Sequence, residues 1–286
     1  ESMSCTNAIS TYPLCSPHRA ALMTGKYPTS CGMWTNCKIL IYRKDIIPED
    51  QVPKTWDEYK AMAEKVAAPD MYGTTVLGSG SDAVCSFLDF ACQAGADGLV
   101  FDSDGNVNIT SQAYVDGLNF MVEMADADYS PSDSLATAST ESQELFTNGK
   151  VAMQLNWSHQ YPAAVEALGA DKVGCAPMIS GSDGIGATTG PWYQCVMKNS
   201  SNKEMAQKYV EYMYDHNADY MDLTLKIAGR TSVYEEAGKE AGNEHTTAVL
   251  KTLQSPQSQP RPMVSTWAQM EEVLTGVVES CLGGAD

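Results

Sequence analysis

Short runs of branched apolar residues alternate with longer segments of helical apolar spacing along most of this chain, from residue 38 onwards. The run at 38–42 is typical of a buried strand, and similar runs predict strands at 72–77, 151–155, 173–176 and 192–197. Between them, apolar residues at helical spacing predict helices at 56–67, 82–94, 111–125, 142–148 and 161–168. This alternation predicts an α/β fold with parallel crossover connections.

Two capping boxes mark the starts of predicted helices. Thr55 and Glu58 precede the helix that ends before Pro69. Ser201 and Glu204 precede a later helix, in which we expect four apolar residues to be buried: Met205, Tyr209, Tyr212 and Met213.

The segment from Asp102 to Asn108 supports two interpretations. Asp104-Gly105 between two apolar runs is a strong hairpin signal. The oxygen-bearing side chains also follow the first positions of a calcium-binding loop, but its twelfth position holds Ala113 instead of a bidentate Glu. The sequence therefore favours a plain hairpin over a calcium site.

The charge of the chain excludes some partners. Asp and Glu number 36 against 18 Lys and Arg, which gives a formal charge of -18. Such a chain repels a phosphate backbone, so nucleic acid is not an expected partner. No apolar run reaches the roughly 18 residues of a membrane span, and no signal peptide opens the sequence.

A reactive cysteine is physically plausible in residues 15–26, which read Cys-Ser-Pro-His-Arg-Ala-Ala-Leu-Met-Thr-Gly-Lys. Pro17 suits the first position of a short helix, and a helix N-terminus beside Cys15, with Arg19 one turn on, would lower the pKa of the thiol. The segment resembles the active-site motif of formylglycine-dependent sulfatases. That resemblance implies that Cys15 is oxidised to formylglycine, that Arg19 holds this nucleophile and that Lys26 contacts the sulfate.

The sulfatase resemblance covers only residues 1–38, which we interpret as a short irregular segment. The family also requires a calcium ion held by acidic residues in several parts of its domain, and this set is not found in the sequence. We therefore do not expect a conventional sulfatase, and calcium is a less favoured cofactor than zinc.

The same segment offers soft ligands that could close on zinc. They are Cys5, Cys15, His18, Cys31 and Cys37. Their spacing matches no standard zinc finger, and the alternative is that these cysteines form disulfides or remain unliganded. With nine cysteines in the chain, at least one stays unpaired if the others form disulfides.

The remainder, residues 39–286, is similar to family 1 extracellular solute-binding proteins of ABC importers. Five ordered blocks carry the resemblance: Tyr42 to Asp45, Val52 to Glu58, Phe146 to Met153, Gly190 to Trp192 with Asn199 to Ala206, and Gly229 to Tyr234. The resemblance implies a periplasmic-binding-protein-like fold of type II, with two α/β lobes hinged around a cleft that binds a solute, usually a sugar. It also implies an extracellular or periplasmic location.

Four residues at matching positions are candidates for the ligand cleft. Trp157 and Trp192 are the expected sugar-stacking residues, with Arg230 and Trp267 near the cleft. Aromatic faces can cover the apolar C–H face of a sugar ring while polar groups hold its hydroxyls. The alternative is that these tryptophans belong to the core.

The sequence therefore divides into a sulfatase-like fragment, 1–38, and a solute-binding region, 39–286, whose first lobe we expect to be truncated. We predict a carbohydrate-type binding protein with weakened or lost affinity. The alternative is a zinc-dependent hydrolase of phosphate or sulfate esters that uses the N-terminal segment. Two chains covering each other's exposed surfaces, by exchange of segments or otherwise, would make a homodimer. Without a leader in the sequence, a cytoplasmic location of this form stays open.

Overall fold

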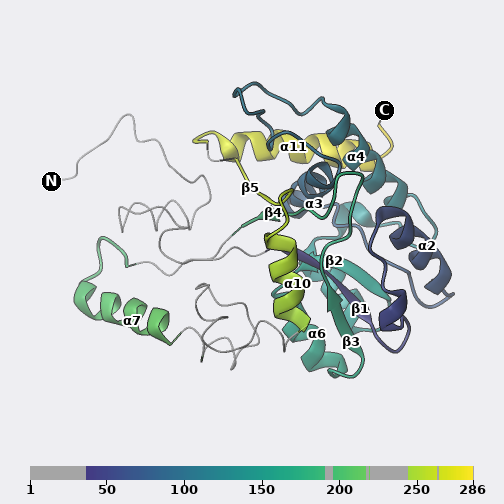
Figure 1. Cartoon of the computed structure of the whole chain (residues 1–286), viewed down its shortest axis with the longest axis horizontal. Helices are drawn as coiled ribbons and strands as arrows, with labels where there is room; N and C mark the ends of the chain where they lie inside the picture. Colours follow the sequence, from purple (N-terminus) through teal and green to yellow (C-terminus); the bar gives the residue numbers. More distant parts are fainter. Residues whose placement is uncertain (1–36, 191–195, 217–218, 220–243, 263, 286) are drawn as a thin grey trace.

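The computed structural model describes residues 37–190, 196–216, 219, 244–262 and 264–285, and its architecture is α/β (Figure 1). Helices surround a small central sheet, as the alternating sequence pattern predicts. In the described part of the chain, every helix is too short or too polar to cross a membrane.

The central sheet contains β1 (Lys38–Arg43), β2 (Met153–Trp157) and β3 (Val173–Ala176) in the order β2-β1-β3. β1 is antiparallel to both neighbours. The predicted parallel crossovers are therefore wrong for the hydrogen-bonded pairs of this central sheet. β2 and β3 do run in the same direction, with helix α6 between them in sequence, but β1 lies between them in the sheet.

Most predicted helices are confirmed with small changes of boundary. The observed helices of this part of the chain are α2 (Trp56–Val66), α3 (Gly80–Gln93), α4 (Gln112–Ala125), α5 (Ser139–Thr147) and α6 (Gln160–Leu168), with the short 3-10 helices η2 (Glu49–Gln51) and η3 (Ser134–Ala136). At the start of α2, the Glu58 amide donates to Thr55 Oγ1 at 3.3 Å, and the Glu58 carboxylate accepts from the Lys54 amide at 2.7 Å.

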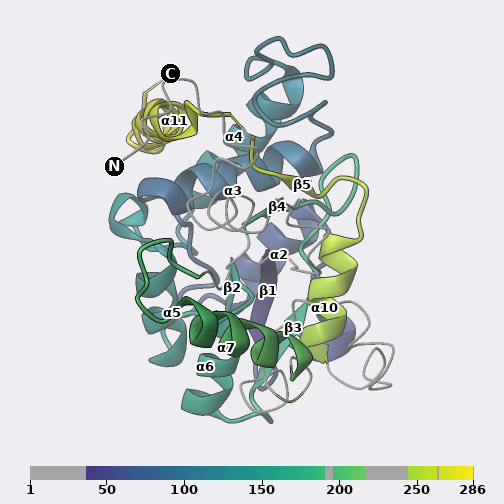
Figure 2. The same cartoon turned by 90° about the vertical axis from the view of Figure 1, so that its left-hand side faces the viewer.

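Two short strands and two packed helices follow the central sheet in sequence. β4 (Thr188–Thr189) pairs in parallel with β5 (Gln259–Pro260), and the later helices are α10 (Glu244–Leu253) and α11 (Trp267–Leu282). Figure 2 shows α10 beside β3, and α11 lies with α3 and α4 on the other side of the molecule in Figure 1.

Two predicted strands differ from the observed structure. Residues 73–77 are buried and Tyr72 is exposed, but the segment forms only one bridge, from Tyr72 to Val151, so it is not a strand. Most of the strand predicted at 192–197 lies outside the described residues, and Val196 and Met197 are not in a strand. The hairpin at Asp102 is confirmed by the antiparallel bridge between Phe101 and Val107.

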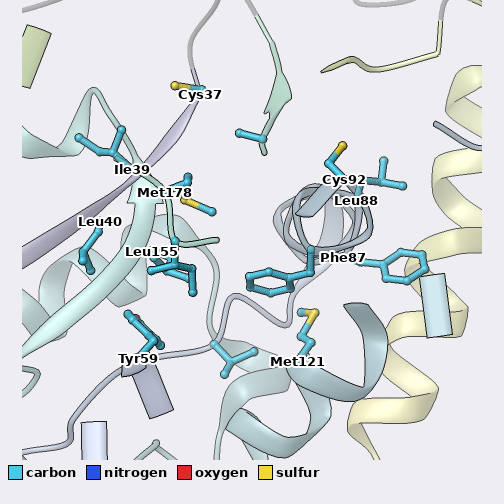
Figure 3. Packing of buried hydrophobic residues seen from close by; sticks show 14 of the residues in the cluster. Cys37, Ile39, Leu40, Tyr59, Phe87, Leu88, Cys92, Met121, Leu155 and Met178 are labelled. Carbon is cyan, nitrogen blue, oxygen red and sulfur yellow. The ribbon is translucent and has the colours of Figure 1, made fainter. Parts of the chain in front are cut away.

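The core centres on α3, which is buried along its whole length from Ala83 to Gln93. Figure 3 shows Phe87 and Leu88 of this helix, Met121 of α4, and Leu155 and Leu40 of the sheet, which all belong to one buried cluster. α3 and α4 approach closely because Gly117 has no side chain: a Cβ there would lie 2.8 Å from the Ala91 amide nitrogen.

Helix α7 (Lys203–Asp215) contradicts its prediction. None of its residues is buried, and the side chains of Met205, Tyr209 and Tyr212 are 68%, 57% and 58% exposed. Met213 is half-buried rather than buried. In Figure 1 the helix lies away from the sheet and the helices that cover it. The apolar stripe was identified correctly, but no described element covers it.

Candidate functional site

The indole of Trp157 is held where three elements begin or end. Trp157 is the last residue of β2, and its Nε1–H donates to Asp82 Oδ1 at 2.7 Å, in the first turn of α3. The other oxygen of Asp82 accepts from the Ser139 amide, the first residue of α5, at 2.8 Å. A carboxylate is favoured there because the unpaired amides of helix N-termini attract negative charge. Asp82 thus fixes the orientation of the indole relative to two helices.

Lys38 places a buried ammonium next to the same indole. Lys38 opens β1 and pairs in register with Trp157, and it is only 1% exposed. Its Nζ donates to Ser86 Oγ at 2.6 Å, lies 3.2 Å from Asp89 Oδ2, and is 5.3 Å from the centroid of the Trp157 ring. A buried cation near an indole gains from the negative face of the ring.

Asp89 extends the cluster to β4. Its Oδ1 accepts hydrogen bonds from the Thr188 amide and, at 2.7 Å, from the Thr188 hydroxyl. Its Oδ2 faces Lys38 and has no hydrogen-bond partner in the described part of the chain. Lys38, Asp89 and Thr188 therefore connect β1, α3 and β4 through one buried polar node.

The pKa values of the two carboxylates of the cluster are shifted in opposite directions. Burial alone would raise the pKa of Asp82, but the Lys38 ammonium and the hydrogen bonds from Trp157 and Ser139 hold it below its usual value. Burial raises the pKa of Asp89, although the Lys38 ammonium and the Thr188 hydrogen bonds act against the rise. Asp82 is half-buried and Asp89 is fully buried, which explains the difference.

Sequence reasoning found Trp157 but missed the residues that hold it. A usable signal was present: Lys38 begins an otherwise apolar strand, and Asp82, Ser86 and Asp89 recur at helical spacing along the apolar helix α3. Polar residues at such positions need partners inside the protein. Their partners are far away in sequence, so only the fold identifies them.

The accessible surface of Trp157 is small. The residue is 8% exposed, and Lys38 lies against its ring. A ligand at this end of β2 would therefore contact only the remaining uncovered part of the indole. The arrangement can position an aromatic surface next to fixed charges.

Trp267, predicted near the cleft, opens α11 and is 3% exposed. It belongs to the buried apolar cluster, and its Nε1–H has no hydrogen-bond partner within the described ranges. The other predicted cleft residues, Trp192 and Arg230, lie outside the described residues, as do the predicted catalytic and metal-ligating residues Cys5, Cys15, His18, Arg19, Lys26 and Cys31.

Cys37 is the one predicted zinc ligand that the structure describes. It is a free, fully buried cysteine, and burial, followed by the nearby Asp89 charge, raises the pKa of its thiol. Metal binding requires the thiolate, so this environment does not favour zinc. Among the described residues, no group of three or more His, Cys, Asp and Glu side chains could hold a metal ion.

A second polar cluster fastens α10 to the sheet. Glu244 accepts a hydrogen bond from the Tyr161 hydroxyl at 2.7 Å and lies 2.9 Å from Lys44 Nζ. The neighbouring His245 is buried, with Nε2 2.9 Å from the Ser158 carbonyl oxygen and its ring 4.8 Å from that of Tyr161. This cluster packs α10 against the end of β2 that carries Trp157.

Comparison with known proteins identifies relatives of this arrangement. "Probable ABC transporter-binding protein" of Deinococcus radiodurans is 25% identical over 193 residues, which are 63% of this chain and 46% of that protein. The chain thus spans about half the length of this curated relative. A separate short match, to "Ulvan-active sulfatase" of Formosa agariphila, is 56% identical over 36 residues, 13% of this chain and 7% of that protein.

Solved structures share the fold. The maltose-bound MalE3 of T. maritima superposes with a TM-score of 0.77 at 27% identity, covering 87% of this chain and 66% of that chain. An ABC transporter solute-binding protein of Thermotoga lettingae, bound with α-D-tagatose, gives a TM-score of 0.75 at 22% identity, covering 88% and 66%. The expected periplasmic-binding-protein-like fold is therefore confirmed.

The family model described as "Bacterial extracellular solute-binding protein" matches residues 27–219, which include the sheet, the Trp157 cluster and α7. This match covers well over half of the chain. The chain belongs to the bacterial extracellular solute-binding protein family.

Proposed function

We propose that this chain is a carbohydrate-type solute-binding protein whose ligand contacts Trp157, with Trp192, Arg230 and Trp267 as further ligand-binding residues. The observation that carries the proposal is the hydrogen bond from Trp157 to Asp82, which holds an indole at the junction of β2, α3 and α5. The likeness to a maltose-bound protein at 27% identity supports a sugar as the ligand class. Proteins of the family are extracellular, and delivery of the ligand to an ABC importer outside the cytoplasm follows from the same proposal.

The affinity is expected to be weak. The chain covers 66% of the length of the maltose-bound structure, and the indole of Trp157 offers a small accessible surface. A sugar that is covered from one side keeps much of its hydration and gains less from burial. We assign 39–286 to this binding region and 1–38 to a separate segment, a boundary that falls after the first residue of β1 (Lys38–Arg43).

Calorimetric titration with maltose and a panel of mono- and disaccharides tests the proposal. Trp157→Ala is expected to weaken binding at least about tenfold, which corresponds to about 1.4 kcal/mol. Trp56→Phe is the matched control, because Trp56 stacks on Phe120 with ring centroids 4.3 Å apart, away from the Trp157 cluster. Asp82→Asn keeps one oxygen acceptor for the indole but turns an NH2 donor toward the Ser139 amide, and it is expected to weaken binding less than Trp157→Ala does. Equal affinity of the wild type and Trp157→Ala would reject the site.

A second candidate function is a zinc-dependent hydrolase of phosphate or sulfate esters. The 36-residue match to a sulfatase favours it, together with the motif that carries Cys15, Arg19 and Lys26. Ligands would come from Cys5, Cys15, His18 and Cys31, with Cys37 unsuited by its buried thiol. Metal analysis of the purified protein and ester hydrolysis before and after chelation test this function. Turnover that is absent, or that persists in Cys15→Ala and after chelation, would exclude it.

A further inference from the structure

Asp82 keeps the capacity to accept a hydrogen bond from a ligand. Its half-buried carboxylate accepts from the Trp157 indole at 2.7 Å and from the Ser139 amide at 2.8 Å, and the Ser139 hydroxyl also interacts with it. The two oxygens of a carboxylate can together accept about four hydrogen bonds. With these three donors among the described residues, the partly exposed carboxylate has room for one more. A ligand that covers the exposed part of the indole therefore meets a charged acceptor beside it.

The N-termini of α3 and α5, both beside Asp82, would ordinarily attract an anionic group. Here their amides already donate to carboxylates of the protein itself. Glu279 accepts from the first amide of α3 at 3.1 Å. Glu141 accepts from the Ala138 amide, directly before α5, at 3.1 Å, and Asp82 accepts from the Ser139 amide that follows. An anionic ligand would have to displace a carboxylate to reach these three amides.

Negative charge is therefore in excess around the indole. The ammonium of Lys38 offers little compensation, because it lies 3.2 Å from the Asp89 carboxylate and both side chains are 1% exposed. Three carboxylates remain at the helix ends: Asp82, Glu141 and Glu279. Each helix N-terminus supplies only about half a unit of positive charge. Arg230, proposed above as a further ligand-binding residue, would add one positive charge and still leave the carboxylates in excess.

We propose that the ligand of the Trp157 site donates a hydrogen bond to Asp82 and carries no anionic group, so that the site selects neutral and amino sugars over uronates. This inference rests on the proposed function and assigns to Asp82 the role of determining specificity. The hydroxyl of a sugar or the ammonium of an amino sugar supplies the donor that the carboxylate accepts. A carboxylate, sulfate or phosphate on the sugar meets a fixed like charge instead, and such an unfavourable contact is an effective way to exclude a ligand.

The expected discrimination follows from the charge of one group on the sugar. Asp82 stays ionised around neutral pH because the Lys38 ammonium and its hydrogen bonds hold its pKa below the usual value. Two like charges about 4 Å apart repel each other enough in bulk water to weaken binding about fivefold, and more strongly in a partly buried site. A uronate should therefore bind at least about fivefold more weakly than the neutral sugar with the same ring.

Calorimetric titration of the full chain with matched sugars tests the selectivity. The probes are glucose, glucuronate and glucosamine, with galactose and galacturonate as a second pair. We expect the neutral sugar of each pair to bind more tightly than its uronate, and glucosamine to bind at least as tightly as glucose. The affinity ratio of glucose to glucuronate should fall as salt is added, because salt screens the repulsion.

Three charge-neutralising variants connect this ratio to the carboxylates. Asp82→Asn should lower the ratio at least about threefold, since it removes the nearest like charge. Glu141→Gln and Glu279→Gln keep an acceptor oxygen for their helix amides and leave the bond between Asp82 and the indole intact, so each should lower the ratio by a smaller amount. Asp57→Asn is the matched control, because it makes the same charge change on α2 at a side chain that is 95% exposed, and it should leave the ratio unchanged.

The outcomes separate this inference from the proposed function. Uronates that bind as tightly as their neutral parents would overturn the inference, and so would a ratio that Asp82→Asn leaves unchanged. In either case the proposed function would stand as long as Trp157→Ala still weakened the binding of neutral sugars. If no sugar bound the wild-type chain, the proposed function and this inference would both be rejected.

Discussion

Replacing Asp89 by Asn should strongly destabilise the protein, because it removes the charge that compensates the buried Lys38. Both side chains of the pair are 1% exposed. Breaking a buried ion pair by removing one partner costs about 3–5 kcal/mol, since the other charge stays buried without compensation. The Asn amide oxygen can still accept the two hydrogen bonds from Thr188, so the loss reports on the interaction with Lys38, which the Asn NH2 group would then face. Asp89→Ala removes these hydrogen bonds too and should cost about 1–3 kcal/mol more.

Urea denaturation followed by far-UV circular dichroism measures these changes as shifts of the midpoint at constant slope. Lys60→Met is the control, because Lys60 pairs with Glu123 at the surface, where an ion pair contributes about 1 kcal/mol or less. The double variant Lys38→Met with Asp89→Leu removes both charges and should be less destabilised than the sum of the two single variants. Additive losses, or a loss for Asp89→Asn no larger than that for Lys60→Met, would refute the assignment of a buried, compensated charge pair.

Three further predictions concern packing, pH and thiols. Gly117→Ala should destabilise by about 1–3 kcal/mol in the same denaturation assay, because the added Cβ would lie 2.8 Å from the Ala91 amide nitrogen, and unchanged stability would contradict this close helix approach. The lowered pKa of Asp82 stabilises the folded protein above pH 3.8, the ordinary pKa of an Asp, and this stabilisation is lost as the pH falls below that value. Asp82→Asn should therefore flatten the acid limb of a plot of stability against pH. An unchanged acid limb would argue against the charge interaction with Lys38. A thiol reagent should label the four buried cysteines, Cys37, Cys85, Cys92 and Cys175, only after unfolding. Rapid labelling of one of them in the native protein would show that this cysteine is not buried.

The helices were predictable because their signals are local. The capping box of Thr55 and Glu58 predicts the start of α2, and the apolar spacing that follows predicts its length and its buried face. The strand at β1 was equally clear from its run of branched residues. Its position between β2 and β3 was not, because no local pattern specifies which distant strand supplies the hydrogen bonds.

The candidate site was only partly predictable for the same reason. An aromatic residue at the end of a strand, Trp157, is visible in the sequence, but its hydrogen-bond partner Asp82 lies 75 residues earlier in the chain. The apolar residues of helix α7 show the opposite limit. Apolar spacing predicts that Tyr209 and Tyr212 form a face, but the spacing does not say whether this chain covers it.

The insertion of β1 between β2 and β3 has a consequence for synthesis on the ribosome. Leu40 emerges before its two sheet partners, Leu155 and Ala176, which follow more than a hundred residues later. Until both partners have been synthesised, both edges of the apolar strand β1 lack hydrogen-bond partners. Strands that depend on such distant partners pair slowly and tend to aggregate. We therefore expect a chaperone to bind the nascent chain at strand β1. Slower translation beyond residue 176 would not shorten the time for which β1 is exposed without its partners.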